Sequence, residues 1–371
     1  MDNKKKNPNV PNLRFTEDFG YLWKTLKIID VAPLQRGFDL PEKDLKLGIY
    51  PVVYSNGIKN YHNQYKAIAP GIVTGRSGTI GKFTYIDNGG YWPHNTSLWV
   101  TDFKSNYPKF VYYLFQFVNF NNYSSGSGVP TLNRNDIHDR KVSIPPLNEQ
   151  IKIATFLDLI EKRIDTQIKI IEDLKVVKEQ ISNQLFKLEM IYNSSYTLND
   201  FLVEGDKTPV QTDKYRKITI KLNKQGIIFS ETNREMADTR PFYKRYENEL
   251  IIGKQNYFNG SIALITKEFD SCICSNAIMS FKINNINKDF LYYQISNNNY
   301  LNSQAYKANG TGQKELSERE FLKFKVWVPT NNVQKEIVKC FKSLELKITN
   351  EILLLSNYTL MKKYLLENMF I

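Results

Sequence analysis

Two long stretches of the chain carry apolar residues at alternating spacings of four and three, the pattern of a helix that packs along another helix. The first stretch follows two prolines, with Asn148 expected as the N-cap, and its apolar positions are Ile153, Leu157, Ile160, Ile164, Ile171, Leu174, Ile181, Leu185 and Leu188. The second has Asn332 as the equivalent cap, and its apolar positions are Ile337, Phe341, Leu344, Ile348, Leu355, Tyr358, Leu365 and Met369. The spacing predicts long helices over residues 147–192 and 331–371.

Polar residues interrupt both apolar seams at matching places: Gln167 and Lys178 in the first, Glu351 and Lys362 in the second. A buried polar layer fixes the register and the partner of a helix at some cost in stability. The interruptions are satisfied together in an antiparallel pair in which Lys178 faces Glu351 and Gln167 faces Lys362. The alternative is two amphipathic helices that each pack on their own domain.

The chain repeats itself at an offset of 184 residues. Residues 124–186, aligned without gaps on residues 308–370, give fourteen identities in sixty-three positions, whereas composition alone predicts about one in fifteen. Upstream, GIVTGRSGTIG at 71–81 is similar to ELIIGKQNYFNG at 249–260. The chain is therefore a duplicated module.

Each module begins with a globular domain, residues 1–146 in the first and 193–330 in the second. Short β-rich runs, such as residues 49–54 and 261–265, are separated by Gly, Asn and Pro, which favours irregular sheets. We expect an α+β fold with two such domains in tandem repeat. Each domain is followed by a long helix, and the two helices pack as an antiparallel coiled coil.

Composition and charge narrow the classes of function. The 371 residues, 42% of them hydrophobic, can build more than one core. Fifty basic and thirty-eight acidic residues give a net charge of +12, which favours a nucleic-acid partner, although the codon bias of an AT-rich genome also enriches lysine. The longest apolar run, 110–115, is too short to span a bilayer, and the first residues do not form a secretory signal. We expect a cytoplasmic protein.

The cysteines predict neither a disulfide framework nor a metal site. Cys272, Cys274 and Cys340 are an odd number in a large chain, and the three histidines lie far from them in sequence. A zinc site requires four ligands. We therefore expect no metal.

A glycine-rich segment in each module offers candidate DNA contacts. GRSGTIGK at 75–82 looks like a phosphate loop, but five residues separate Gly75 from Gly81 and a phenylalanine follows the lysine, so the pattern of an ATP-binding loop is not met. A turn that brings Arg76 to DNA explains the segment better, and an ordinary hairpin is the alternative. Gly253 and Lys254 stand at the same place in the second module.

The candidate DNA-binding residues are basic, amide and aromatic side chains in or near these segments. In such positions arginine can bind guanine O6 and N7, and glutamine or asparagine can bind adenine N6 and N7. In the first domain the candidates are Arg36, Lys59, Asn60, Tyr61, Arg76, Ser77, Tyr91, His94 and Asn95. In the second domain they are Arg234, Arg240, Lys244, Arg245, Lys254, Gln255, Asn256, Asn276, Lys307 and Thr311. Each could equally be a solvated surface residue, and His94 could be a core histidine.

The motif PPLNEQIKIATFLDLIEKRID at 145–165, which follows a Gly-Ser-Gly turn, resembles the start of the conserved helix in the specificity (S) subunit of type I restriction-modification systems. The resemblance covers nearly the whole chain. The second copy, VPTNNVQKEIVKCF at 328–341, departs from the motif because it lacks the second proline and has Val333 where the first copy has Glu149.

The resemblance implies two target recognition domains that each read one half of a bipartite, asymmetric double-stranded DNA target. The helices would hold the two domains apart, since the 36 residues from 153 to 188 form a helix of about 54 Å, roughly 15 base pairs of DNA. The family's subunit has no catalytic activity. It docks modification subunits, which methylate adenine with S-adenosylmethionine, and restriction subunits then join.

Two further observations agree with a non-catalytic subunit whose partners carry out catalysis. The sequence has no Asn-Pro-Pro-Tyr or Asp-Pro-Pro-Tyr tetrapeptide for an extruded adenine and no Walker pattern, so S-adenosylmethionine and ATP are expected on partner subunits and no cofactor on this chain. Ile168, Ile170, Val176 and Val177 lie off the seam and are expected to cover the modification subunits. The alternatives are an independent enzyme, a non-specific nucleic-acid binder and a protein-interaction scaffold with a coiled-coil core.

Overall fold

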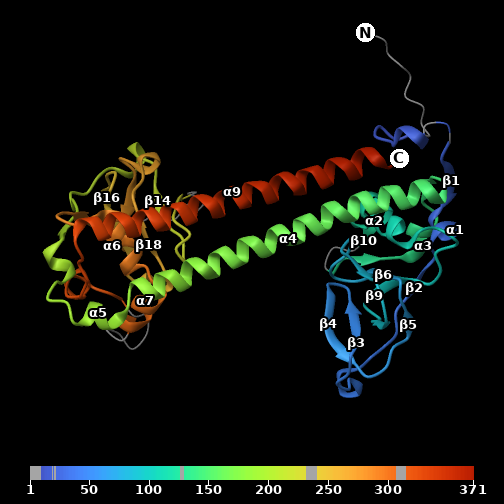
Figure 1. The fold of residues 1–371 in the computed structure, drawn as a ribbon, viewed down its shortest axis with the longest axis horizontal. Coiled ribbons are helices and arrows are strands. Elements are labelled where there is room, and N and C mark those ends of the chain that lie inside the picture. Colours follow the sequence, from blue (N-terminus) through green and yellow to red (C-terminus); the bar gives the residue numbers. More distant parts are fainter. Residues whose placement is uncertain (1–9, 19, 21, 126–128, 231–239, 306–314) are drawn as a thin grey trace, which may run out of the picture. The chain divides into compact units, whose positions relative to one another are not determined.

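The computed structural model describes residues 10–18, 20, 22–125, 129–230, 240–305 and 315–371 (Figure 1). Three candidate DNA-binding residues, Arg234, Lys307 and Thr311, lie outside these ranges. The chain forms two compact units, Met1–Ile168 with Leu353–Ile371, and Lys169–Ile352. Each unit contains one globular domain and one half of each long helix.

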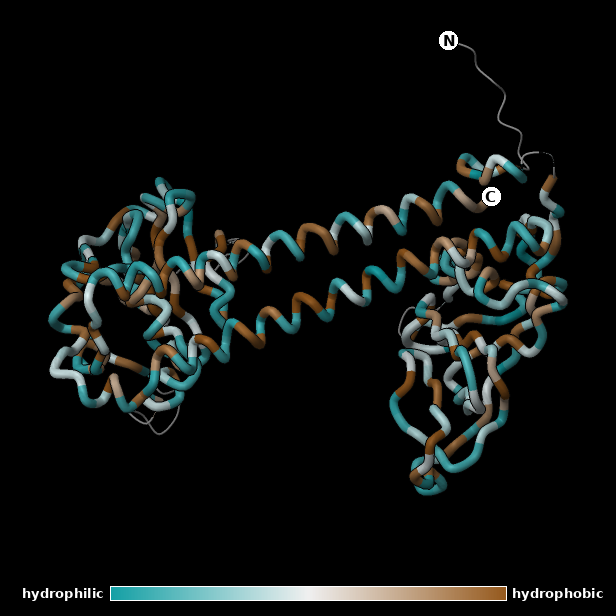
Figure 2. Tube along the Cα trace, in the orientation of Figure 1, coloured by the Kyte–Doolittle hydropathy of each residue, from teal (hydrophilic) through white to brown (hydrophobic). Residues whose placement is uncertain are grey.

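The long helices are α4 (Leu147–Leu185) and α9 (Asn331–Met369), each of 39 residues. Hydrophobic and hydrophilic residues alternate along both (Figure 2). None of the helices within the described ranges is long and apolar enough to span a membrane. All the predicted seam residues, including Lys178, Glu351 and Lys362, are buried or half-buried.

Both helices begin earlier than the predicted caps. The amide of Gln150 donates to the carbonyl of Pro146, and that of Gln334 donates to the carbonyl of Thr330. The predicted N-caps at Asn148 and Asn332 are therefore wrong, because the asparagines already lie within the first helical turn.

The repeated glutamine at the start of each helix joins that helix to its domain. Gln150 donates to the carbonyl of Pro145 (3.0 Å) and accepts from the amide of Tyr107 (2.8 Å). Gln334 makes the equivalent bonds to Pro329 (2.9 Å) and Asn287 (3.0 Å). Both glutamines are buried, so a substitution would leave buried backbone groups unpaired.

The domain of the first unit is built on two four-stranded sheets, with strand orders β2-β9-β6-β7 and β4-β3-β8-β5. Its elements are η1 (Thr16–Asp18), β1 (Lys24–Lys27), α1 (Ile28–Val31), β2 (Leu34–Arg36), η2 (Glu42–Asp44), β3 (Tyr50–Tyr54), β4 (Gly57–His62), β5 (Ala67–Ile68), β6 (Gly71–Gly75), β7 (Phe83–Ile86), β8 (Gly90–Pro93), β9 (Ser97–Val100), α2 (Pro108–Val118), η3 (Phe120–Tyr123), β10 (Ser124–Ser125), β11 (Thr131–Leu132), α3 (Arg134–His138) and β12 (Lys141–Ile144). Two further pairs, β1 with β12 and β10 with β11, complete it.

The domain of the second unit has one four-stranded sheet, in the order β13-β20-β17-β18, and the pairs β14-β15 and β16-β19. Its elements are α5 (Leu188–Tyr192), η4 (Leu198–Asp200), β13 (Leu202–Glu204), η5 (Thr212–Lys214), β14 (Ile218–Ile220), β15 (Ile227–Phe229), β16 (Phe242–Lys244), β17 (Leu250–Gly253), η6 (Tyr257–Asn259), β18 (Ile262–Leu264), η7 (Lys267–Phe269), β19 (Ile273–Ser275), β20 (Ile278–Ile283), α6 (Lys288–Ile295), α7 (Asn298–Gln304) and α8 (Glu318–Leu322). The four-stranded sheet repeats the order of β2-β9-β6-β7.

The two cores repeat the same aromatic contact. In the first unit Phe370, just beyond α9, packs on Phe110 of α2, with ring centroids 5.4 Å apart. In the second, Phe186, just beyond α4, packs on Phe290 of α6 at 5.7 Å. Phe186 and Phe370 are identical residues at the repeat offset, so each domain is covered by the end of a helix that begins on the other domain.

In each unit, α4 and α9 run antiparallel, and a polar cluster joins both helices to the domain. In the first unit Lys362 binds Glu161 at 2.7 Å, and the hydroxyl of Tyr113 donates to the same carboxylate at 2.8 Å. In the second unit Lys178 binds Glu345 at 2.7 Å, and Tyr293 donates at 2.8 Å. We call these the lysine–glutamate–tyrosine clusters.

The tyrosines remain donors in both clusters. Burial raises the pKa of the Tyr113 and Tyr293 hydroxyls, and the neighbouring glutamate charge raises it further. A protonated hydroxyl and an ammonium group thus share one carboxylate, which is satisfied on both oxygens.

The antiparallel direction is as predicted, but the predicted register is wrong. Lys178 contacts Glu345 instead of Glu351, and Lys362 contacts Glu161 instead of Gln167. Glu351 is paired with Lys347 on its own helix. The register shifts because Glu161 and Glu345, which the apolar pattern does not mark, are the carboxylates that the domain tyrosines can reach.

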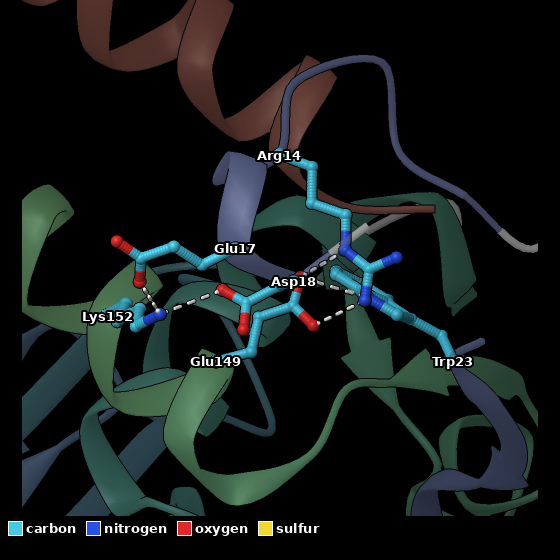
Figure 3. A network of polar contacts seen from close by, with 6 residues as sticks. All are labelled: Arg14, Glu17, Asp18, Trp23, Glu149 and Lys152. Carbon is cyan, nitrogen blue, oxygen red and sulfur yellow. Dashed lines mark hydrogen bonds and ion pairs between the residues drawn. The ribbon is translucent and has the colours of Figure 1, made fainter. Parts of the chain in front are cut away.

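The first segment of the first domain is attached to the start of α4 by a buried network (Figure 3). Arg14 makes two hydrogen bonds of 2.7 Å to the carboxylate of Glu149, and both side chains are 1% exposed. Trp23 also donates to Glu149, at 3.2 Å. The amide of Leu13 donates to the carbonyl of Asn368 in the last turn of α9, so the segment bridges both helices of its unit.

We predict that the ion pair between Lys178 and Glu345 stabilises the second unit. Reversing one charge should break the pair, and exchanging both charges should restore it. Glu345→Lys should destabilise the second unit by about 1–2 kcal/mol, because it brings two cations together and removes the acceptor of Tyr293. The double variant Lys178→Glu/Glu345→Lys should recover part of this loss. Thermal unfolding of the full chain measures both, and a double variant no more stable than Glu345→Lys would contradict the pairing.

We further predict that Glu149→Gln destabilises the first unit by about 3 kcal/mol, because it leaves the Arg14 guanidinium buried without a countercharge. Glu17→Gln is the matched control. Its carboxylate pairs with Lys152 but is 77% exposed, so the unfolding midpoint should stay close to that of the native chain. Equal unfolding midpoints for the two variants would show that the Arg14 pair adds no stability.

Candidate nucleic-acid interface

Three arginines from separate segments of the first domain line one cavity of about 470 Å³. Arg36 ends β2, Arg76 follows β6 and Arg134 begins α3. The remaining lining residues are Leu98, Ser125, Thr131, Leu132 and Asn133. We call this site the arginine cavity.

Backbone contacts bring the arginine-bearing segments together. The amide of Leu132 donates to the carbonyl of Arg76 at 2.8 Å, and the side chain of Asn133 caps α3 by accepting from the amide of Asn135. No residue other than glycine fits at position 75, since a Cβ there would lie 1.7 Å from the carbonyl oxygen of Thr79. The glycine therefore permits the close turn between Gly75 and Thr79, in which Arg76 lies.

The cavity carries an excess of positive charge. Arg36 has a long ion pair with Asp39, at 3.7 Å. Within the described part of the chain, no carboxylate forms an ion pair with Arg76 or Arg134. A guanidinium group matches a phosphate or the O6 and N7 atoms of guanine with two parallel hydrogen bonds, so the cavity suits the phosphate backbone or a guanine edge.

The other candidates of the first domain do not line the arginine cavity. Ser77 lies next to Arg76 and forms a β-bridge with Thr131, one of the lining residues. The strand β4 carries three exposed candidates, Lys59, Asn60 and Tyr61. His94 and Asn95 lie in the turn before β9, and Asn95 donates to Asp39.

His94 is half-buried beside Tyr54, with ring centroids 4.2 Å apart. Burial lowers the pKa of this histidine, which favours a neutral ring near pH 7. Tyr91 is 1% exposed and belongs to the core, so its prediction as a DNA contact is wrong. Its ring fills the space above Gly71, where a Cβ would lie 2.4 Å from the Tyr91 hydroxyl.

In the second domain, some candidate DNA-binding residues lie at the surface and others are partly or fully buried. The exposed ones are Arg240, Gln255, Asn256 and Asn276. Lys244 is half-buried between the rings of Tyr215 and Tyr246. Lys254 lies 3.7 Å from the carboxylate of Glu318.

Arg245 is 2% exposed and is removed from the candidate DNA contacts. Its guanidinium donates to the sulfur of Cys274 at 3.2 Å and to the carbonyl of Asp206 at 2.8 Å. Burial raises the pKa of the Cys274 thiol. No cluster of three or more possible metal-ligating side chains occurs among the residues that the structure describes.

Sequence reasoning missed Arg134. The available signal was its place in the repeat, two residues after Leu132, which is aligned with Leu316. At the repeat offset Arg134 is aligned with Glu318, so a charged position close to an identical pair differs between the two copies.

Comparisons with known proteins agree with this architecture. The family model described as the type I restriction modification DNA specificity domain matches residues 21–176 and 193–354. The type I restriction enzyme MjaVIII specificity subunit of Methanocaldococcus jannaschii is 22% identical in an alignment of 251 residues that covers 60% of this chain and 59% of that protein. The match therefore spans about three fifths of the length of this relative.

Solved structures share the fold. The type I restriction-modification system S subunit from M. genitalium matches with a TM-score of 0.61 at 16% identity, over 98% of this chain and 99% of that chain. A chain from a structure of complex assembly and conformational transition in the type I R-M system matches with a TM-score of 0.56 at 12% identity, over 93% and 96% of the two chains.

We predict that Arg76→Ala and Arg134→Ala each weaken binding of the full chain to duplex DNA by about 1–3 kcal/mol. A phosphate contact would also reduce the slope of log affinity against log salt by about one, whereas a base contact would leave that slope and relax sequence preference. Fluorescence anisotropy over a salt series distinguishes the two. Lys43→Ala, an exposed lysine outside the cavity, is the control, and equal affinities for all three variants would exclude the cavity as a DNA contact.

Proposed function

Because the chain belongs to the family of type I restriction modification DNA specificity domains, we propose that it is the sequence-reading specificity subunit of a type I restriction-modification complex in the cytoplasm. The observation that carries this proposal is the duplication. The family model matches two stretches, and each contains a globular domain followed by the first part of a long helix. Two readers on one chain are suited to a target in two parts.

The two domains would read the two halves of an asymmetric target. Their loops differ at equivalent places, with Arg76 in one and Lys254 in the other, so they would prefer different sequences. The helices α4 and α9 would act as spacers, because a 39-residue helix is about 58 Å long. The polar clusters would fix their register.

The arginine cavity would supply contacts to the first half-site. Three guanidinium groups attract the polyanionic duplex, and the fork of each can bind two acceptors at once. Exposed lysines and the net charge of +12 would add affinity that does not depend on sequence.

The outer faces of the long helices would bind the modification subunits. Ile168, Val176 and Val177 are 39%, 54% and 41% exposed, so α4 presents apolar side chains that a partner could cover. Ile170 is half-buried instead. Catalysis would belong to the partners, with S-adenosylmethionine on the modification subunits and ATP on the restriction subunits.

We predict that removing this chain from a host that carries its partner subunits abolishes adenine methylation at one bipartite motif. Long-read sequencing of genomic DNA before and after deletion measures the loss. Re-expression of the native chain should restore the motif, and re-expression of Arg76→Ala/Arg134→Ala should restore it weakly or with a relaxed first half. Methylation that is unchanged by the deletion would refute the proposal.

A further inference from the structure

The arginine cavity has a structural counterpart in the second domain. The amide of Leu316 donates to the carbonyl of Lys254 at 2.9 Å, as the amide of Leu132 does to that of Arg76 at 2.8 Å. The helix that follows each leucine is capped by a polar side chain, Ser317 for α8 and Asn133 for α3. Arg134 and Glu318 are thus the first residues of equivalent helices.

Strand register extends the equivalence to the third arginine. Gly75 pairs with Ser97, and Gly253 pairs with Ile278, which aligns β9 with β20 residue by residue. The same register applies to the neighbouring strands, β2 on β9 and β13 on β20. It makes Asp206 in the second domain the equivalent of Arg36 in the first. The arginine cavity therefore corresponds to Asp206, Lys254 and Glu318.

The charge of the site is inverted between the two domains. Three cations in the first domain become one cation and two carboxylates in the second. Glu318 is 21% exposed, and its carboxylate lies 2.8 Å from Lys207 and 3.7 Å from Lys254. The two lysines flank the carboxylate and reduce its repulsion from a nearby phosphate backbone.

We propose that Glu318 is a specificity-determining residue that accepts a hydrogen bond from an exocyclic amino group, cytosine N4 or adenine N6, in the half-site of the second domain. This inference rests on the proposed function. A carboxylate only accepts hydrogen bonds, so it pairs with an amino-bearing edge. It repels the O6 and N7 acceptors of guanine and the O4 acceptor of thymine.

The division of roles follows from the neighbours of Glu318. Lys207 and Lys254 are oriented toward its carboxylate and can extend to the phosphates on either side of the base. Because an ammonium group binds phosphate without regard to sequence, the lysines supply affinity and the carboxylate supplies the choice of base.

The test is the methylation motif of complexes that contain Glu318 variants. With the native chain, one position of the second half-site should require cytosine or adenine. With Glu318→Ala, discrimination at that position should fall by about 5- to 150-fold, while the first half-site stays the same. Glu318→Gln, which keeps the shape of the side chain, should relax the same position, and it keeps the test decisive if the alanine variant folds poorly.

Two control variants test whether the effect is specific to Glu318. Glu320→Ala, on the same helix, should leave the motif unchanged, and Arg134→Ala should change the first half-site alone. An unchanged motif with both Glu318 variants would overturn the inference, as would a uniform loss of methylation at all sequences without relaxation. If the native complex methylates no bipartite motif, the proposed function itself fails.

Discussion

The structure depends on the exchange of helix ends between the two repeats. Each domain is covered at one side by the start of its own helix and at another by the end of the other repeat's helix, so neither module contains its whole core. Phe370 and Phe186 supply the apolar part of this exchange. The lysine–glutamate–tyrosine clusters supply the polar part, and they use the same three residue types in both units.

The duplicated polar clusters explain why the register is specific. An apolar seam tolerates displacement by a turn, because one leucine can replace another at little cost. A carboxylate that receives both an ammonium group and a tyrosine hydroxyl has one position in which both bonds form. The tyrosine is held by the globular domain, so the domain and the helix pair determine each other's placement.

The sequence could predict the helices, their antiparallel direction and the duplication, because these depend on the spacing of residues along the chain. It could not predict the register, since Tyr113 and Tyr293 approach the helices from the domains. Arg76 was found through its glycine, but the cavity also needs Arg134, which reaches it through a backbone bond between distant segments. Tyr91 and Arg245 have the chemistry of DNA contacts, and tertiary packing alone places them in the core.

The contact between Leu13 and Asn368 joins two segments that lie far apart along the chain. All of residues 169–352 is synthesised before the segment that completes the first unit, although domains usually fold in the order in which they are translated. The unit begun earliest is consequently finished last. Its apolar surface therefore stays incomplete while residues 169–352 are synthesised.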